Sequence, residues 1–335
     1  MPESTLPECV AEFLDRHRAA NQPLAIALSG GMDSMVLLDV LASATAGNMA
    51  SRPALQAIHV NHRISPKADA WADFCRAQCA RRGIPLTVAI VEVDRNSGAG
   101  LEAAARDARY AALMKSEVPF VLSAQHQDDQ AETVLHQMLR GTGLNGLAGM
   151  GESRQLRAGQ ALLRPLLNVS RAEIDAYAAE HQLKWIDDES NLDTAFTRNF
   201  IRHDLLPVIK TRFPHYAESL YRTAQHAAES AELLEALAAI DLGWNGHEAH
   251  AGALDVLPRP RQVNALYHWL RWLKVSPPSR LQLEDWAAQL FRAPPGGKPQ
   301  QAGGHDFVIR RRQNALLLMR RGEATEQGQD QLHTE

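Results

Sequence analysis

Six residues between an apolar strand and an apolar helix combine small, hydroxyl and acidic side chains: Ser29, Gly30, Gly31, Met32, Asp33 and Ser34. Two glycines let the backbone approach an anion, and their N–H groups form an anion nest with the N-terminus of the helix. The loop holds no lysine, so positive charge must come from elsewhere. Asp33 would repel phosphates unless a divalent cation bridged them, which predicts Mg²⁺. The alternative is a plain turn in which Asp33 caps the helix.

A second acidic group lies about a hundred positions downstream, in the stretch QDDQAET. Asp129 and Glu132 are three residues apart on a predicted helix, so their carboxylates share one face. Such a pair suits a metal ion or an ammonium group, and one member could accept a proton. The alternative is an exposed acidic helix start that the helix dipole favours.

These residues need a scaffold that brings distant strand ends together. Short apolar strands are predicted at 24–28, 55–60, 85–91 and 118–123, with helices at 34–45, 66–82, 100–116 and 128–140. This alternation predicts an α/β fold with a parallel, doubly wound sheet and helices on both faces. Ligands bind such sheets beyond the carboxyl ends of the strands. Three of these ends carry unusual residues, so we expect them to converge: 29–34, 59–63 and 124–132.

The rest of the chain predicts a second, smaller region. After a glycine-rich loop at 141–153 we expect a strand, a helix capped at Ser170, a polar loop and another helix. One long helix follows, then two amphipathic helices, a turn and a pair of short strands around a basic turn: 212–241, 253–274, 279–291, 294–304 and 305–320. The predicted organisation is a catalytic domain, a helical linker, a smaller α+β C-terminal domain and a disordered tail: 1–215, 216–248, 249–321 and 322–335.

Composition narrows the class of protein. The 335 residues predict two domains, and a net charge of −4 gives no global basic signature, although an average can hide a basic face. The acidic N-terminus and the lack of a long apolar run predict a cytoplasmic protein. Three cysteines, Cys9, Cys75 and Cys79, are too few for a disulfide framework. Cys75 and Cys79 lie four apart on a predicted helix, which favours core packing over metal binding.

The motifs together resemble a known family. The loop SGGMDS after a strand resembles the pyrophosphate loop of the ATP-pyrophosphatase, or PP-loop, group, whose members cleave ATP between the α- and β-phosphates. Four further stretches resemble tRNA(Ile)-lysidine synthetase: HVNHRIS at 59–65, LEAAARDARYAAL at 101–113, AQHQDDQAETVLHQMLRGTGLNGLAGM at 124–150 and DDESNLDTAFTRNFIRHDLLP at 187–207. The resemblance is close over 20–215 and looser over 216–320. Longer members carry a further C-terminal domain, so the chain resembles a shortened form.

This resemblance implies a two-step reaction. ATP adenylates the carbon-2 carbonyl oxygen of the wobble cytidine in the CAU anticodon of an isoleucine tRNA, and free L-lysine then displaces AMP. ATP and Mg²⁺ are the implied cofactors, tRNA(Ile) and lysine are the partners, and a homodimer is left open. The catalytic residues are expected to be Asp33, Asp129 and Glu132, of which Asp33 and Asp129 hold the metal. ATP is expected to contact the loop 29–34 with His59, Asn61 and His126.

Gln125 departs from the family pattern, in which two histidines commonly precede the acidic run. The first histidine is expected near the α-phosphate of ATP. Gln125 can donate a hydrogen bond there but carries no positive charge. Either His126 takes this role or a neutral donor suffices.

Arginines are the expected contacts for lysine and tRNA. Arg198, Asn199 and Arg202 match the family pattern, and Arg198 or Arg202 is predicted to hold the lysine carboxylate or RNA. An ion pair with Asp187, Asp188 or Asp193 is the alternative. Arg106 and Arg109 are predicted to contact tRNA or phosphate, with a solvated helix face as the alternative. Further basic surface is predicted at Arg154, Arg157, Arg164, Arg171, Arg259, Arg261, Arg310, Arg311, Arg312, Arg320 and Arg321, unless these are ordinary surface residues.

Other functions stay open at this point. A sulfur transferase of the same group is disfavoured, because Cys75 and Cys79 lie in a predicted core helix. A non-catalytic nucleotide- or RNA-binding protein would not need Asp33, Asp129 and Glu132 together. An amidating synthetase would need a glutaminase domain ahead of the loop.

Overall fold

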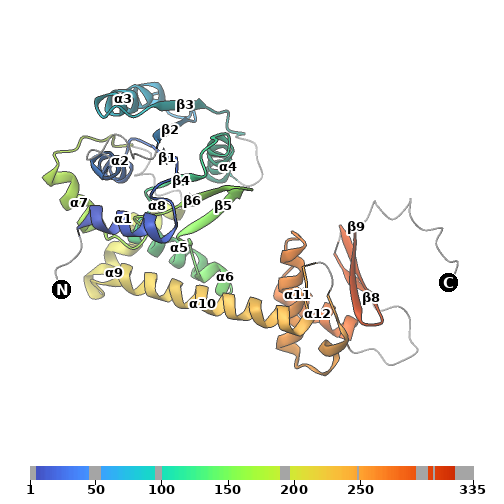
Figure 1. The fold of residues 1–335 in the computed structure, drawn as a ribbon. Helices are drawn as coiled ribbons and strands as arrows, with labels where there is room; N and C mark the ends of the chain where they lie inside the picture. Colours follow the sequence, from blue (N-terminus) through green and yellow to red (C-terminus); the bar gives the residue numbers. More distant parts are fainter. Residues whose placement is uncertain are drawn as a thin grey trace. The chain divides into compact units, whose positions relative to one another are not determined.

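A computed structural model describes residues 5–44, 54–94, 100–188, 197–246, 249–291, 301–304 and 306–320. The tail predicted at 322–335 lies outside these residues. The chain divides into two compact units, Met1–Ala227 and Ala228–Glu335. The boundary falls within the long helix α10 (Tyr216–Leu242), which the sequence predicts (Figure 1). No helix in the described part of the chain combines the length and the apolar character needed to cross a bilayer.

Unit 1 is built on a six-stranded sheet in the order β3-β2-β1-β4-β6-β5. Its strands are β1 (Leu24–Ala27), β2 (Leu55–Asn61), β3 (Leu86–Ile90), β4 (Phe120–Leu122), β5 (Ser153–Arg157) and β6 (Gln160–Leu163). The first five in this order run parallel, and β5 pairs antiparallel with β6. The chain order reverses at β1, which lies between β2 and β4. A parallel sheet binds ligands at such a reversal, beyond the carboxyl ends of the strands.

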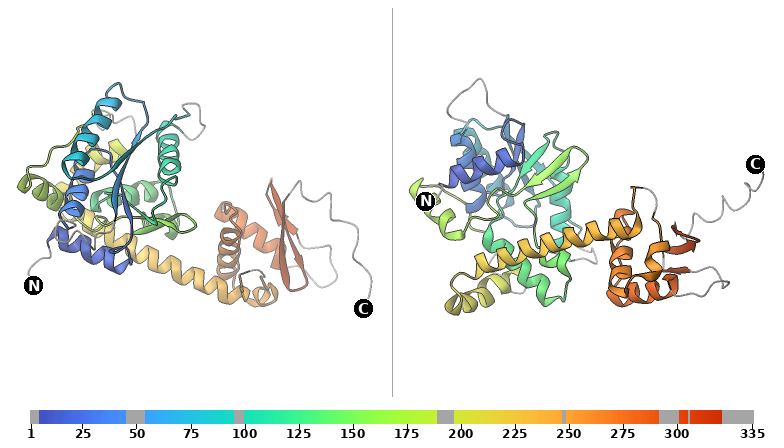
Figure 2. Two further views of the ribbon diagram at one scale, coloured as in Figure 1. Left: turned by 45° about the horizontal axis from the view of Figure 1, so that its top comes forward. Right: turned by 60° about the horizontal axis from the view of Figure 1, so that its bottom comes forward.

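Helices cover both faces of this sheet (Figure 2). Leu24 and Ile26 of β1 share a core with α1, α2, α3 and α7, whereas Ala25 packs on the other side with residues of α4. This arrangement confirms the predicted doubly wound sheet. The helices of unit 1 up to this point are α1 (Leu6–Arg16), α2 (Met32–Ala44), α3 (Ala68–Arg81), α4 (Leu101–Leu113), α5 (Gln127–Leu139), α6 (Leu144–Leu147) and α7 (Arg171–Glu180).

Three elements of unit 1 differ from the prediction. Helix α1 was not expected, although it begins with a capping box at Thr5 and buries Val10, Phe13 and Leu14. The strand expected after the glycine-rich loop corresponds to β6, but β5, which pairs with it in a hairpin, was not expected. Strand β5 is largely exposed, so it lacks the apolar alternation that marks a strand. The glycine-rich loop itself contains the short helix α6.

The helix expected after the polar loop is broken into three pieces. Helices α8 (Thr197–Phe200) and α9 (Leu206–Arg212) flank a π-helical turn at Ile201–Leu205. Such turns widen a helix locally and are frequent at functional sites. This turn carries Arg202, one of the predicted site residues.

Unit 2 combines helices with a three-stranded antiparallel sheet. After α10 come a 3₁₀ turn at Gly252–Val256, helices α11 (Arg259–Trp272) and α12 (Arg280–Phe291), and strands β7 (Gln301–Gly303), β8 (Phe307–Arg312) and β9 (Ala315–Arg320). The two helices and the strand pair confirm the prediction. The turn predicted at 294–304 is wrong at its end, where β7 pairs with β8. Arg310, Arg311 and Arg312 lie in β8, so they do not form the turn either.

Candidate active site

Gly30 shapes the loop between β1 and α2. Its φ is +90°, a conformation that residues with a Cβ rarely adopt. A Cβ at this position would lie 2.6 Å from Cδ1 of Ile186 and 3.1 Å from Sγ of Cys75. The carbonyl of Gly30 also accepts a hydrogen bond of 2.9 Å from the backbone N–H of Ile186. Only glycine fits here, so the loop packs closely against the segment that contains Ile186.

The two serines of the loop are engaged within it. The hydroxyl of Ser34 accepts from the N–H of Gly30 (3.1 Å) and donates to the carbonyl of Gly31 (2.9 Å). The hydroxyl of Ser29 accepts from the N–H of Gly31 at 3.3 Å. The glycine N–H groups that were expected to face an anion therefore point at hydroxyls. The first turn of α2 still offers N–H donors, because helix geometry leaves them without an intrahelical acceptor.

Three helix N-termini meet beside this loop. Asp33 lies in the first turn of α2, His126 is the N-cap of α5, and Arg171 is the first residue of α7. The carboxylate of Asp33 lies 3.7 Å from Nε2 of His126 and 3.0 Å from Nη1 of Arg171. The backbone N–H of Arg171 donates to the carboxylate of Asp128 at 3.3 Å. The positive ends of three helices thus surround one point, a favourable seat for an anion.

His126 is buried and its ring orientation is fixed. The backbone N–H of Asp128 donates to Nδ1 (3.3 Å), which assigns the ring proton of neutral His126 to Nε2. Nε2 lies 3.5 Å from a carboxylate oxygen of Asp129, in addition to its contact with Asp33. Gln125 instead accepts a hydrogen bond from the hydroxyl of Ser123. His126 is therefore the residue of this pair that contacts Asp33.

Asp33 and Asp129 form a carboxylate pair around His126. Burial raises the pKa of Asp33, His126 and Arg171 oppose this rise, and the charge of Asp129 adds to it. Mg²⁺ in proteins is commonly held by one or two carboxylates and completed by phosphate oxygens and water. The pair fits this donor set. The described residues contain no cluster of three or more His, Cys, Asp or Glu side chains suited to a metal.

Arg202 binds two carboxylates of α5, those of Glu132 and Asp129. Its Nε donates to Glu132 at 2.5 Å, and its Nη2 donates to Glu132 and to Asp129, each at 2.9 Å. Burial raises the pKa of Glu132, and the hydrogen bonds from Arg202 oppose that rise. The pKa of Arg202 lies above its usual range, because hydrogen bonds and the charge of Glu132 outweigh the effect of burial.

The ion pairs of Arg202 differ from the alternative considered for it from the sequence, whereas that alternative stays a prediction for Arg198. Its partners are Glu132 and Asp129 rather than Asp187 or Asp188, and Asp193 lies outside the described residues. Arg198 donates to the hydroxyl of Thr133 at 3.3 Å, so it also lies against α5. Asn199 follows it on α8.

Comparison with known proteins identifies the family. A model described as the PP-loop domain matches residues 3–209. The chain belongs to the PP-loop family. A second model, the TilS substrate binding domain, matches residues 250–317. These matches agree with the resemblance that the motifs carry.

Two similar proteins share the name tRNA(Ile)-lysidine synthase. A tRNA(Ile)-lysidine synthase from Alkalilimnicola ehrlichii is 45% identical over 296 residues, covering 86% of this chain and 65% of the relative. One from Pseudomonas fluorescens is 46% identical over 257 residues, covering 73% and 57%. The chain thus spans less than two thirds of their length. The structure of a U34-tRNA thiolase from Methanococcus maripaludis superposes with a TM-score of 0.55, covering 67% of this chain and 78% of that chain at 20% identity, which supports the fold alone.

His59 and Asn61 support the PP-loop from the neighbouring strand β2. Nδ1 of His59 donates to the carbonyl of Leu28 at 2.9 Å, and burial lowers the pKa of this histidine. The amide of Asn61 donates to Asp69 (2.8 Å) and accepts from the N–H of Arg63 (2.9 Å). These bonds fix the ends of β1 and β2. A contact of either residue with ATP stays a prediction.

A cavity of about 480 Å³ adjoins the site at Asp128 and Arg171. Its wall includes the N-termini of α5 and α7 and several residues between 210 and 218. Tyr216 lies in this wall and donates a hydrogen bond of 2.7 Å to the carboxylate of Asp128. The sequence did not single out Tyr216. The sequence predicts the helix cap at Ser170, and this cap makes Arg171 the first residue of α7, at the carboxyl edge of the sheet beyond β6. The predicted cap is therefore the sequence feature that could have identified Arg171 as a site residue.

Three arginines surround Tyr110 on α4. The guanidinium of Arg154 lies 4.6 Å and that of Arg106 5.6 Å from the centre of the tyrosine ring. Burial would raise the pKa of Tyr110, but Arg106, Arg164 and Arg154 together lower it. Arg164 is only 3% exposed and donates to the carbonyl of Gly151 at 2.6 Å, so its prediction as surface is wrong. Arg106 and Arg154 are exposed and form a basic patch.

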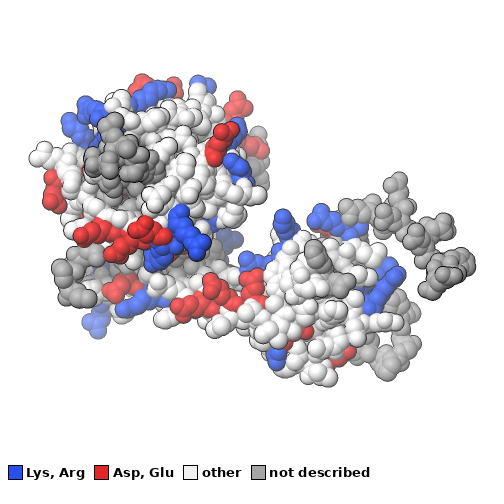
Figure 3. Space-filling model, viewed as in Figure 1, with Lys and Arg blue, Asp and Glu red and all other residues white. Residues whose placement is uncertain are grey.

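Other predicted surface arginines have structural partners. Arg157 donates to the carbonyls of Met114 (3.0 Å) and Ser116 (2.9 Å). Arg261 pairs with Asp241, and Arg311 binds Asp255 through bonds of 2.5 and 2.6 Å. Arg312 is exposed at the end of β8. Arg321 lies outside the described residues. Figure 3 shows basic and acidic side chains interspersed on one face of each unit, with acidic ones gathered along α10.

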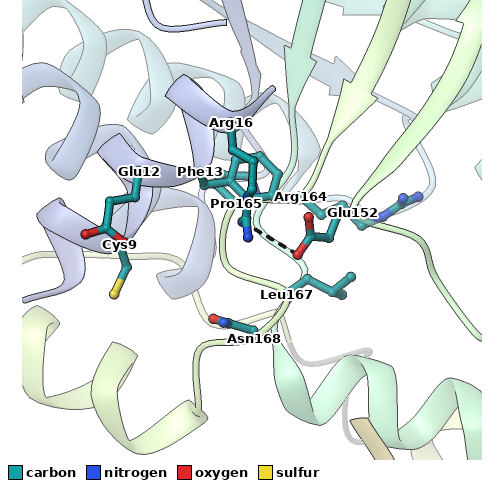
Figure 4. A pocket seen from close by; sticks show the side chains of 9 residues that line it. All are labelled: Cys9, Glu12, Phe13, Arg16, Glu152, Arg164, Pro165, Leu167 and Asn168. Carbon is teal, nitrogen blue, oxygen red and sulfur yellow. Dashed lines mark ion pairs between the residues drawn. The ribbon is translucent and has the colours of Figure 1, made fainter. Parts of the chain in front are cut away.

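A smaller cavity of about 200 Å³ lies between α1 and the segment that follows β6 (Figure 4). Glu152 there lies 3.7 Å from Arg16 and 3.1 Å from His17. Glu152 and Arg16 therefore form an ion pair in the wall of this cavity. This cavity marks the packing of α1 onto the sheet.

Proposed function

We propose that the protein uses ATP to join L-lysine to carbon 2 of the wobble cytidine in the CAU anticodon of tRNA(Ile), releasing AMP and pyrophosphate. One observation carries this proposal. An anion seat at Asp33, His126 and Arg171 adjoins a paired acidic site at Asp129 and Glu132, where the order of the strands reverses. ATP needs the first and the ammonium group of lysine needs the second. The names of the relatives point to the same reaction.

In the first step the residues around the PP-loop align the nucleotide. A carbonyl oxygen is a weak nucleophile, so it must be positioned against the α-phosphate while the departing pyrophosphate is neutralised. The N-termini of α2, α5 and α7 favour the phosphates, and His126 offers its Nε2–H beside Asp33. Mg²⁺ bound by Asp33 and Asp129 would add charge neutralisation.

In the second step the carboxylates of α5 receive lysine. The ε-ammonium group has a pKa of about 10.4 in water and must lose a proton before it attacks. Asp129 and Glu132 provide negative charge for its binding. Because burial raises the pKa of Glu132, this carboxylate is a stronger base than an exposed one. Arg198, held against Thr133, is the candidate for the carboxylate of lysine.

The RNA partner needs basic surface on both units. In unit 1 the exposed side chains of Arg106 and Arg154 over Tyr110 suit backbone phosphates. In unit 2 the residues that match the TilS substrate binding domain include β8, with Arg310 and the exposed Arg312. These positions support binding of tRNA by both units.

Sulfur transfer is the competing function, and the cysteines argue against it. Burial raises the pKa of Cys75 to about 12 and that of Cys79 to about 11. A thiol with such a pKa is a poor source of the thiolate that sulfur chemistry and cluster binding need. Both cysteines pack in the core of unit 1.

The test is direct. The protein is incubated with ATP, Mg²⁺, radiolabelled lysine and tRNA(Ile) bearing a CAU anticodon, and the label in the RNA and the AMP released are measured. The same tRNA with uridine at the wobble position and an Asp129→Asn variant are the controls. We expect label only with the cytidine-bearing tRNA and the unaltered protein, with one AMP per lysine. Release of AMP and pyrophosphate with another acceptor, and no label in this tRNA, would overturn the assignment.

A further inference from the structure

The PP-loop itself contains no basic residue, yet the proposed chemistry releases pyrophosphate. Ser29–Ser34 has no lysine or arginine, and its Asp33 adds a negative charge. The N–H groups of Gly30 and Gly31 are hydrogen-bonded to Ser34 and Ser29. Any cationic side chain that neutralises a departing pyrophosphate alongside Mg²⁺ must therefore lie outside the loop.

Arg171 lies over the place where such charge is needed. Its Nη1 donates to Asp33 at 3.0 Å and its Nη2 contacts Sδ of Met32 at 3.8 Å. Its guanidinium thus covers the first two residues of α2, where an anion at the helix N-terminus would lie. The contact of Nη2 with a thioether sulfur is weak, so Nη2 of the guanidinium can still donate strong hydrogen bonds to an anion.

Arg171 is anchored at its backbone N–H and at Nε, whereas the ion pair at its tip is partly exposed to water. Nε of Arg171 donates to Asp175 one turn along α7 at 2.9 Å, and its backbone N–H donates to Asp128 at 3.3 Å. The Arg171 side chain is 45% exposed and that of Asp33 is 31% exposed, so water reaches their ion pair. An exposed pair of this kind is worth at most about 1 kcal/mol and opens readily.

We propose that Arg171 is the cation that the PP-loop lacks, and that its guanidinium exchanges Asp33 for the β- and γ-phosphates of ATP and then holds the departing pyrophosphate. The exchange frees the Asp33 carboxylate at the moment when the phosphates arrive. This inference rests on the proposed function only in taking ATP as the substrate. Arg202 is less suited to the role, because Glu132 and Asp129 already bind it through three hydrogen bonds.

Binding of ATP, inorganic pyrophosphate and AMP to the RNA-free protein tests this role, measured by isothermal titration calorimetry. We expect Arg171→Ala to weaken pyrophosphate and ATP by about 10- to 100-fold, as for the loss of hydrogen bonds to a charged group, and AMP by less than about twofold. Arg171→Lys should recover part of the pyrophosphate affinity because it keeps the charge, whereas Arg171→Gln should not. Melting temperatures establish that each variant is folded.

Arg280 provides a matched control. It is also the first residue of a helix, follows a serine, and donates through Nε to a carboxylate one turn along at 2.9 Å. Arg280→Ala should leave all three affinities unchanged. Equal losses for AMP and pyrophosphate, or Arg171→Ala binding like the wild type, would overturn the inference alone. A wild-type protein that binds neither ATP nor pyrophosphate would overturn the proposed function as well.

Discussion

Removal of Arg202 tests whether Glu132 is held as a buried carboxylate. The Glu132 side chain is 5% exposed, and Arg202 gives it two hydrogen bonds, of 2.5 and 2.9 Å, and a third to Asp129. Removing one partner of a buried ion pair costs about 3–5 kcal/mol. Because the Arg202 side chain is 40% exposed, water can enter the gap. We therefore expect Arg202→Ala to lower the free energy of unfolding by about 3 kcal/mol, at the lower end of that range.

The size of this loss should depend on pH. Burial already raises the pKa of Glu132 in the folded protein, and Arg202 limits that rise. Without Arg202 the folded-state pKa of Glu132 rises further. A carboxyl group with a raised pKa favours folding when it is protonated, and this contribution disappears as the pH rises through the folded-state pKa. The variant should therefore be closest to the wild type in acid, with a larger deficit at pH 8 than at pH 5.

Scanning calorimetry at both pH values measures the effect. For a unit of this size about 3 kcal/mol corresponds to a fall of about 6–12 °C in the melting temperature. Arg222→Ala is the control, because Arg222 pairs with Glu218 at an exposed position on α10 and should change stability by less than about 0.5 kcal/mol. A loss that is equal at pH 5 and pH 8, or no larger than that of the control, would refute the reasoning.

Three further predictions concern the loop and the RNA surfaces. Gly30→Ala should lower the melting temperature and remove ATP binding in calorimetry, because the φ of Gly30 is +90° and a Cβ there would lie 2.6 Å from a side chain. Gly143→Ala is the control and should do neither, because the space around Gly143 is open. Arg311→Ala should cost about 2 kcal/mol in thermal unfolding of unit 2, since its charged hydrogen bonds fix an aspartate, whereas exposed Arg312→Ala should leave stability unchanged and weaken tRNA binding. Arg154→Gln should reduce the slope of log affinity for tRNA against log salt by about 1; an unchanged slope would place the RNA elsewhere.

Much of the sheet was predictable because four of its strands are short apolar segments separated by helices. Strands β1 to β4 are short apolar runs, and the helices between them have clear start and stop signals. The spacing of apolar residues and these signals were therefore sufficient to predict the elements. Strands β5 and β7 were not predicted, because they form by pairing with a neighbouring strand and have no apolar pattern of their own. Helix α1 was missed although its capping box and its apolar spacing are both present in the sequence.

The location of the site was more predictable than its pairings. The rule for parallel sheets places the loop after β1 beside the start of α5, and the contacts between Asp33 and His126 agree with it. The partner of Asp33 lies 138 residues away, and the partner of Glu132 lies 70 residues away. Such pairs are selected by the packing of α7 and of the π-helical turn. Neither local propensity nor residue spacing encodes that packing.

The two arginine–carboxylate pairs of the site differ in how readily they can separate. Arg171 and Asp33 are both partly exposed, so opening their ion pair costs at most about 1 kcal/mol. A single charge-assisted hydrogen bond to a phosphate contributes more than this. Arg202 and Glu132 share a buried carboxylate, and separating them would leave that charge without a partner at about 3 kcal/mol or more. Arg171 and Asp33 can therefore exchange partners when ATP binds, while Arg202 and Glu132 keep their geometry. A lysine site that stays fixed while the phosphate site rearranges suits the proposed reaction, in which lysine attacks an intermediate formed beside it.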